Sequence, residues 1–171
     1  EDFTDSSKTL YEFENLALST NPDKKIETEL SDILNVLDEN KIINSTKIKE
    51  KFWDMFIIDA LIGNTDRHNG NWGFLVDNQT KEVEFAPIYD CGSCLNPMID
   101  DNEMEKLKEN EIKNLAINCY SCLKENGKKI NYMTYIRNNK NEECHKAIIR
   151  VFKNINIIKI NNFIDGVSCM S

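Results

Sequence analysis

The sequence predicts an α+β protein that is mainly α, with several helices and one β-hairpin. In most segments apolar residues recur at intervals of three and four, which is the periodicity of amphipathic helices. Between residues 72 and 85 the pattern changes to alternation: Trp72, Phe74 and Val76 alternate with more polar or smaller neighbours, as in half-buried strands. At 171 residues, without repeats or Pro-rich linkers, the chain is expected to form a single domain over residues 1–171.

The first two predicted helices lie in the amino-terminal quarter. Apolar residues between 10 and 18 indicate a short helix that ends at Asn21-Pro22. Residues 26–40 place Ile26, Leu30, Ile33, Leu34 and Leu37 on one face, with acidic residues opposite.

The next helix is expected to be the central, buried one. Ser45 or Thr46 can cap its start, and apolar residues from Ile48 to Ala60 cover most of its circumference. Gly63 can adopt the left-handed conformation that ends a helix. This helix therefore sets the position of the loop that follows.

That loop and the hairpin carry the chemistry. Residues 78–81 have turn composition, so the strands on either side form a hairpin whose open end joins Asn71 to Asp90. Asp66 lies five residues before Asn71, in the loop that leads to the same end. The sequence therefore predicts that these three side chains lie close together.

An aspartate, an asparagine five residues later and a second aspartate after a hairpin match the template of phosphoryl transfer in protein kinases. There the loop aspartate accepts the proton of the substrate hydroxyl, and the asparagine and later aspartate hold magnesium. Both tasks need hard oxygen donors. The alternative is a polar loop that only caps a helix and opens a hairpin, since Asp and Asn are common in loops.

Two segments carry a family resemblance: residues 62–74, which contain Asp66-Arg-His-Asn-Gly-Asn71, and residues 86–95, which contain Tyr89-Asp90-Cys91-Gly92. They resemble the catalytic and metal-binding segments of HipA-like and CtkA-like bacterial serine/threonine kinases. The first is also similar to the loop of phosphoinositide lipid kinases. The resemblance implies the carboxy-terminal lobe of a protein-kinase-like fold, a helical bundle with a catalytic β-hairpin, that uses Mg²⁺ and ATP.

The resemblance also implies roles for individual residues. Asp66 would be the catalytic base, and Asn71 and Asp90 would bind magnesium and, through it, the nucleotide. His68 would contact a nucleotide phosphate or brace the loop, and a hydrogen bond within the loop is an equal alternative. Arg67 would pair with a carboxylate or phosphate, or lie exposed on the surface.

The remainder of the chain is expected to be helical after a charged stretch at residues 99–110, which we interpret as a solvated helix or loop. Residues 112–123 are ambiguous, Asn126-Gly127 marks a turn, and helices follow around residues 130–136, 144–152 and 155–164. Two Cys-x-x-Cys pairs, Cys91/Cys94 and Cys119/Cys122, are expected to be free thiols, the second on one helical turn. A four-thiolate zinc site is the alternative.

Composition limits the function classes. A net charge of −8 argues against direct nucleic-acid binding and against an anionic membrane surface as partner. No apolar run is long enough for a transmembrane helix, so we expect a cytoplasmic protein.

The sequence contains no Gly-x-Gly-x-x-Gly and no strand lysine of the kinase type before the catalytic loop. We therefore expect a fragment that lacks the amino-terminal kinase lobe and has little activity alone, while the complete protein would phosphorylate a protein substrate. Two alternatives stay open: a non-catalytic, kinase-shaped interaction module with an antitoxin-type partner, and a lipid or small-molecule kinase.

Overall fold

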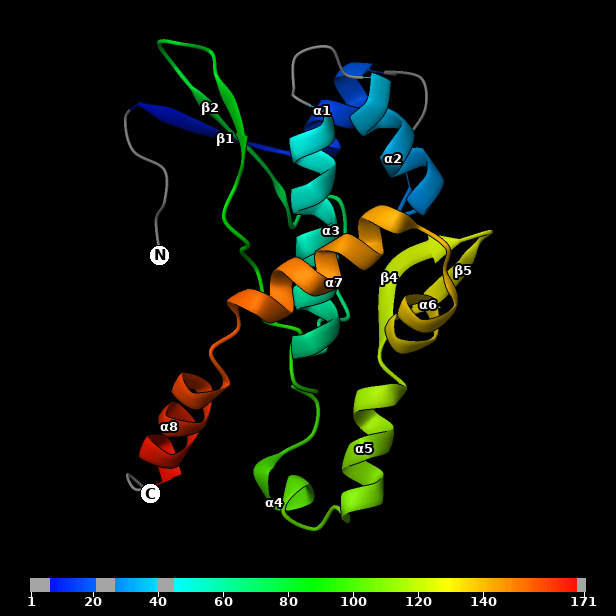
Figure 1. Cartoon of the computed structure of the whole chain (residues 1–171), viewed down its shortest axis with the longest axis vertical. Coiled ribbons are helices and arrows are strands. Elements are labelled where there is room, and N and C mark those ends of the chain that lie inside the picture. Colours follow the sequence, from blue (N-terminus) through cyan, green and yellow to red (C-terminus); the bar gives the residue numbers. More distant parts are fainter. Residues whose placement is uncertain (1–6, 21–26, 40–44, 169–171) are drawn as a thin grey trace.

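The computed structural model describes residues 7–20, 27–39 and 45–168 of the chain. Its helices and strands are arranged around one long helix, α3 (Ser45–Ile62; Figure 1). The helices are α1 (Phe13–Thr20), α2 (Leu30–Glu39), α3 (Ser45–Ile62), α4 (Asp101–Met104), α5 (Glu109–Ile117), α6 (Tyr132–Asn138), α7 (Glu142–Asn154) and α8 (Ile157–Ser168). The strands are β1 (Lys8–Glu12), β2 (Gly73–Asp77), β3 (Val83–Phe85), β4 (Tyr120–Glu125) and β5 (Lys128–Asn131).

Helix α3 is the centre of the fold, as the sequence predicts. Phe52, Trp53 and Phe56 are at most 1% exposed, and α3 packs against α2 and α7, which crosses it (Figure 1). Trp53 and Phe56 meet edge to face with ring centroids 5.5 Å apart. Because the helix is apolar on nearly every side, surrounding elements fix its orientation and therefore the start of the loop at its end.

The predicted hairpin is confirmed as β2 and β3, which pair antiparallel with Phe74 opposite Phe85. The prediction of one helix from residue 10 is wrong in part: β1 occupies residues 8–12, pairs antiparallel with β2, and α1 begins at Phe13. The sheet order is therefore β1-β2-β3, with β2 in the middle. Residues 8–12 lack a strong pattern of their own, and pairing with β2 determines their conformation.

The sheet is attached to the core beside the predicted site. Phe13 stacks on Trp72 at a centroid separation of 4.2 Å, and the Phe13 amide donates to the Trp72 carbonyl at 2.9 Å. Both side chains are at most 1% exposed. This contact fixes the position of Trp72, which lies between Asn71 and the first residue of β2.

A second hairpin lies in the region where the sequence leaves residues 112–123 ambiguous and marks a turn at Asn126-Gly127. The helix predicted around residues 130–136 is present as α6, although residues 130 and 131 belong to β5. Helix α5 ends at Ile117, and β4 and β5 form a two-stranded sheet around the predicted turn at Asn126-Gly127. The expectation that Cys119 and Cys122 lie on a helical turn is wrong, since Cys122 is in β4 and Cys119 precedes it. The apolar run here is short, and short runs fit a strand or a helix equally well.

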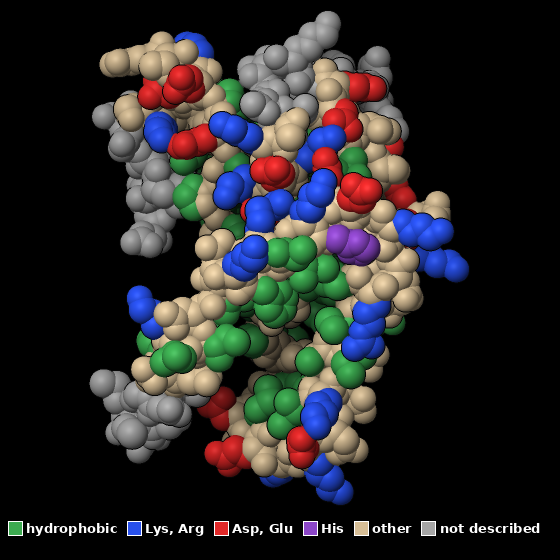
Figure 2. Space-filling model, in the orientation of Figure 1, with side chains coloured by type: hydrophobic (Ala, Val, Ile, Leu, Met, Phe, Trp, Pro, Cys, Tyr) green, Lys and Arg blue, Asp and Glu red, His purple; other side chains and the backbone are tan. Residues whose placement is uncertain are grey.

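The carboxy-terminal part of the described chain leaves apolar side chains at the surface. The predicted helices at residues 144–152 and 155–164 are present as α7 and α8. Figure 2 shows hydrophobic side chains gathered over α7, α8 and α5 around a hollow. No helix in the described ranges is both long enough and apolar enough to cross a bilayer. The exposed apolar residues of α5, α7 and α8 include Ile112, Phe152, Ile157, Ile158 and Phe163.

Gly73 tests the pairing of β1 with β2. A Cβ atom at Gly73 would lie 2.2 Å from the Tyr11 carbonyl oxygen, so Gly73→Ala forces the two strands apart. We expect the variant to lose about 1–3 kcal/mol of unfolding free energy, measured by urea denaturation. Gly92→Ala is the matched control, because the nearest atom to a Cβ there is 3.9 Å away. Equal stability of both variants would contradict the strand order.

Candidate active site

The predicted catalytic loop begins where α3 ends. Gly63 has φ +65°, the left-handed conformation expected of a residue that stops a helix. The buried side chain of Asn64 then links helix and loop: its Nδ2 donates to Asp59 Oδ1 at 2.9 Å, and its Oδ1 accepts from the Asp66 amide at 3.1 Å. The Tyr132 hydroxyl donates to the Asn64 carbonyl at 2.8 Å. The path of the loop is thus fixed from its first residues.

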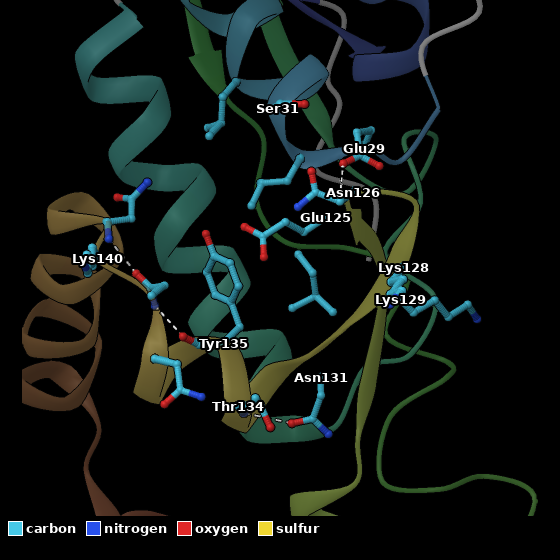
Figure 3. A pocket seen from close by; sticks show the side chains of 16 residues that line it. Glu29, Ser31, Glu125, Asn126, Lys128, Lys129, Asn131, Thr134, Tyr135 and Lys140 are labelled. Carbon is cyan, nitrogen blue, oxygen red and sulfur yellow. Dashed lines mark hydrogen bonds between the residues drawn. The ribbon is translucent and has the colours of Figure 1, made fainter.

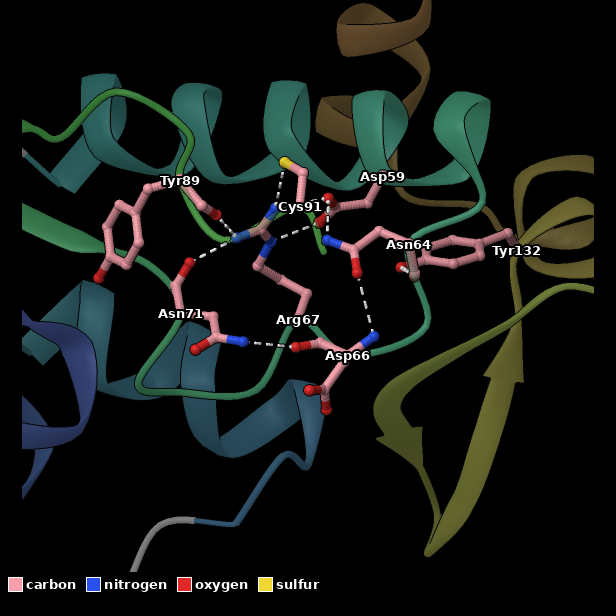
Figure 4. A network of polar contacts seen from close by, with 8 residues as sticks. All are labelled: Asp59, Asn64, Asp66, Arg67, Asn71, Tyr89, Cys91 and Tyr132. Carbon is pink, nitrogen blue, oxygen red and sulfur yellow. Dashed lines mark hydrogen bonds and ion pairs between the residues drawn. The ribbon is translucent and has the colours of Figure 1, made fainter. Parts of the chain in front are cut away.

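A buried ion pair between Asp59 of α3 and Arg67 of the loop forms the centre of the site (Figure 4). Arg67 Nε donates to Asp59 Oδ2 at 2.9 Å, and Nη2 donates to Oδ1 at 2.8 Å. Both residues are 1% exposed, so Arg67 is not the exposed surface arginine that was one alternative. Its remaining nitrogen, Nη1, donates to the carbonyls of Asn71 and Tyr89.

The two charges of this pair depend on each other. Burial raises the pKa of the Asp59 carboxyl, and the hydrogen bonds from Arg67 and Asn64 act in the opposite direction. Burial also lowers the pKa of the Arg67 guanidinium, but the hydrogen bond and charge of Asp59 raise it by more. Removing either partner would therefore leave an uncompensated charge inside the protein.

Asp66 is held by its backbone and presents its carboxylate outward. Its amide donates to Asn64 Oδ1, and its carbonyl accepts from Asn71 Nδ2 at 2.9 Å. The carboxylate is exposed and points away from the polar network in Figure 4. A carboxylate whose backbone is held by hydrogen bonds and whose oxygens are accessible to solvent can accept a proton from an incoming hydroxyl.

The same guanidinium contacts the backbone of Asn71 and the two residues that flank Asp90. Arg67 Nη1 contacts the Asn71 carbonyl, while the residues on either side of Asp90 contact Arg67 through the Tyr89 carbonyl and the Cys91 sulfur, 3.6 Å from Nη2. Asp90 itself is exposed and has φ +52°, a conformation that aspartate tolerates better than most residues. The loop and the end of the hairpin thus share one anchor.

The His68 side chain forms a hydrogen bond within the loop. Its Nδ1 accepts from the Gly70 amide at 3.1 Å, and the loop is closed by Asn71 N donating to the His68 carbonyl at 3.0 Å. In the neutral ring an accepting Nδ1 leaves the proton on Nε2. The exposed His68 ring therefore presents a donor to the solvent side of the loop.

The donor set fits magnesium rather than a softer metal. Because the amide nitrogen of Asn71 is engaged by the Asp66 carbonyl, the side chain presents its oxygen, Oδ1, on the other side. Asn71 Oδ1 and the Asp90 carboxylate are both hard oxygen donors, the kind of ligand that Mg²⁺ uses beside phosphate oxygens and water. Across the described ranges, no group of three or more His, Cys, Asp or Glu side chains is placed to hold a metal ion.

A wide hollow lies away from the predicted site residues. A cavity of about 1180 Å³ lies between α2, the β4–β5 hairpin and α6, and none of the predicted site residues lines it (Figure 3). The hollow is lined by two glutamates, Glu29 and Glu125, and by three lysines, so its lining does not favour a ligand of one particular charge. The predicted site instead lies on an open surface, where Asp66, His68 and Asp90 are exposed.

Comparison with known proteins identifies the family. The family model of the HipA-like C-terminal domain matches residues 8–155, most of the chain and the whole of the loop and both hairpins. The chain belongs to the HipA-like C-terminal domain family. The resemblance inferred from residues 62–74 and 86–95 is thereby confirmed.

Two proteins that this HipA-like domain matches are named as kinases. The chain is 41% identical over 175 residues, 99% of its length, to the serine/threonine-protein kinase CtkA of Helicobacter pylori (strain J99). It also matches the crystal structure of a Helicobacter pylori proinflammatory kinase CtkA, with a TM-score of 0.85 and 39% identity over 96% of this chain and 62% of that one. The HipA-like domain spans about half the length of the curated relative. The α+β, kinase-like fold class is confirmed.

Sequence reasoning assigned no role to three residues that form this network. Asp59 lies in the predicted central helix, Asn64 in the loop segment that carries the resemblance, and Tyr132 in the helix predicted around residues 130–136. Asp59 did carry a signal: it is an ionisable residue inside an otherwise apolar helix, and such a residue is almost never fully buried unless it is paired.

Asp59→Asn tests the importance of the buried pair. The variant keeps the shape of the side chain but leaves Arg67 without a counter-charge, so we expect a loss of about 3–5 kcal/mol in unfolding free energy, measured by urea denaturation. Asp54→Asn is the matched control on the same helix, because Asp54 forms an equivalent but partly exposed pair with Arg150. There we expect a loss of about 1 kcal/mol or less. A small loss in Asp59→Asn would mean that the pair does not organise the site.

Proposed function

We propose that the HipA-like domain is the carboxy-terminal catalytic lobe of a serine/threonine protein kinase, which transfers the γ-phosphoryl group of Mg-ATP to a protein hydroxyl. The observation that carries the proposal is the set of contacts made by Arg67. This one guanidinium contacts the Asn71 carbonyl and the residues on both sides of Asp90, and Asn71 in turn contacts Asp66. A loop aspartate, an asparagine and a second aspartate thus belong to one rigid frame, as phosphoryl transfer requires.

In this proposal Asp66 orients the substrate hydroxyl and accepts its proton, since its carboxylate is exposed while its backbone is held on both sides. Asn71 Oδ1 and the Asp90 carboxylate hold magnesium. When bound, Mg²⁺ neutralises negative charge on the phosphates during transfer. His68 donates from Nε2 to a phosphate oxygen, because its Nδ1 is already engaged by the Gly70 amide.

The open surface at the site leads to the second part of the proposal. A kinase site needs a glycine-rich loop and a lysine on the other side of the nucleotide. We propose that an amino-terminal lobe supplies them, in keeping with a relative about twice as long. The HipA-like domain alone is then expected to bind Mg-ATP weakly and to turn over little.

A protein substrate is proposed rather than a lipid because the curated relative is named a serine/threonine-protein kinase. An antitoxin-type partner stays a prediction, and the exposed apolar side chains of α8, such as Ile158 and Phe163, are the surface that a protein partner would bury.

Substitution of the two aspartates tests the proposed chemistry. In the full-length protein, Asp66→Ala removes the base and Asp90→Ala removes a metal ligand. We expect each to lower the rate of phosphate transfer from radiolabelled ATP to protein by at least ~100-fold. Asp101→Ala, an exposed aspartate in the first turn of α4, is the control and should keep its activity. Undiminished transfer in Asp66→Ala or Asp90→Ala would remove that residue from the mechanism, and label transferred to lipid would change the substrate class.

A further inference from the structure

Two cysteines lie in a turn that begins directly after Asp90. The Cys94 amide donates to the Cys91 carbonyl at 3.2 Å, which closes a tight turn through Gly92 and Ser93. The ends of such a turn are less than about 7 Å apart at Cα, within the range that a disulfide bridges. The Cys91 and Cys94 side chains are within hydrogen-bonding reach of each other, and both cysteines are reduced.

The two thiols differ in accessibility in the way that a reactive pair requires. Cys91 is exposed and contacts the Arg67 guanidinium, whereas Cys94 is half-buried behind it. An oxidant in solution would therefore reach the Cys91 sulfur first, with the Cys94 sulfur in position to react next.

The turn is anchored at both ends. Arg67 holds the Tyr89 carbonyl before it, and the Leu95 amide after it donates to the Ile62 carbonyl at the end of α3, at 2.9 Å. Only residues 90–94 lie between these anchors. When a bond between the two sulfurs tightens the turn, the backbone of this short stretch must absorb the change.

We expect that change to alter the conformation of Asp90 more than that of the other residues in the stretch. Asp90 already has φ +52°, and its Oδ1 lies beside Gly92, 3.9 Å from where a Cβ of that residue would be. Leu95 also has a positive φ, of 56°, which is costly for a branched side chain. The backbone of this stretch therefore has little conformational freedom, so a shift at Cys91 or Gly92 moves the Asp90 carboxylate.

We propose that Cys91 and Cys94 form a peroxide-sensitive thiol pair whose disulfide displaces the Asp90 carboxylate and reversibly weakens the binding of Mg-nucleotide. This inference rests on the proposed function, because it takes Asp90 as a magnesium ligand. It adds an oxidation site that the transfer reaction itself does not use.

The chemistry balances with hydrogen peroxide as the oxidant. The Cys91 sulfur attacks one peroxide oxygen, the O–O bond breaks, and a sulfenic acid and one water form. The Cys94 sulfur then attacks the Cys91 sulfur, the S–S bond forms, the S–O bond breaks and a second water leaves. Two thiols lose two electrons and two hydrogens, and peroxide is reduced to two waters. A dithiol such as dithiothreitol reverses the process by exchange.

The test uses the full-length protein with stoichiometric hydrogen peroxide, followed by alkylation and peptide mass spectrometry. We expect a disulfide between Cys91 and Cys94, at least a ~10-fold loss of Mg-ATP affinity in a thermal-shift titration, and recovery with dithiothreitol. Cys94→Ser should keep the binding of the untreated protein and lose its sensitivity to peroxide. Cys119→Ser is the matched control and should remain as sensitive as the natural protein.

Three results would overturn the inference: no Cys91–Cys94 disulfide, a disulfide without change in Mg-ATP affinity, or protection by Cys119→Ser. The last would make Cys119, which lies near the Leu95 amide beside Gly63, the true partner. A reduced protein that binds Mg-ATP but transfers no phosphate would contradict the proposed function instead, and the effect of peroxide on binding would still decide this inference.

Discussion

The ion pair between Asp59 and Arg67 is the interaction on which the rest of the site depends. A guanidinium has five N–H donors in a rigid plane, and here they reach the last turns of α3, the loop that follows it and the segment that leaves the hairpin. Burial makes these hydrogen bonds strong and also makes them necessary, since neither charge has access to water. Three segments that are separate in sequence are thereby held as one unit.

This arrangement separates the buried residues that hold the loop from the exposed residues for which we propose a role in the reaction. Asp59, Asn64 and Arg67 are buried and hydrogen-bonded to one another or to the backbone, while Asp66, His68 and Asp90 are exposed. The backbones of Asp66 and His68 are hydrogen-bonded within the loop, and the two neighbours of Asp90 contact Arg67. A site built in this way can present its carboxylates without reorganising when a substrate arrives, which is the condition for efficient electrostatic catalysis. It also means that damage to the buried pair and loss of an exposed carboxylate should have different signatures, the first in stability and the second in chemistry.

The sequence was informative where a pattern is local. The alternation from Trp72 to Phe85, the turn at residues 78–81 and the helix-stopping Gly63 all act over a few residues, and the structure contains each of them. Strand β1 could not be predicted in the same way, because residues 8–12 become a strand only by pairing with β2, more than sixty positions later. For the same reason Asp59 could be recognised as unusual on an apolar helix, but its pairing with Arg67 required knowledge of where the loop folds back.

The central claim is that Asn71 and Asp90 belong to one magnesium site organised by Arg67. It is tested most directly by a crystal structure of the full-length protein with Mn²⁺ and a non-hydrolysable ATP analogue, in which anomalous scattering locates the metal. The account predicts a metal about 2.1 Å from both Asn71 Oδ1 and an Asp90 carboxylate oxygen, with the Asp66 carboxylate facing the γ-phosphate. A nucleotide-bound metal that neither Asn71 nor Asp90 contacts would contradict it.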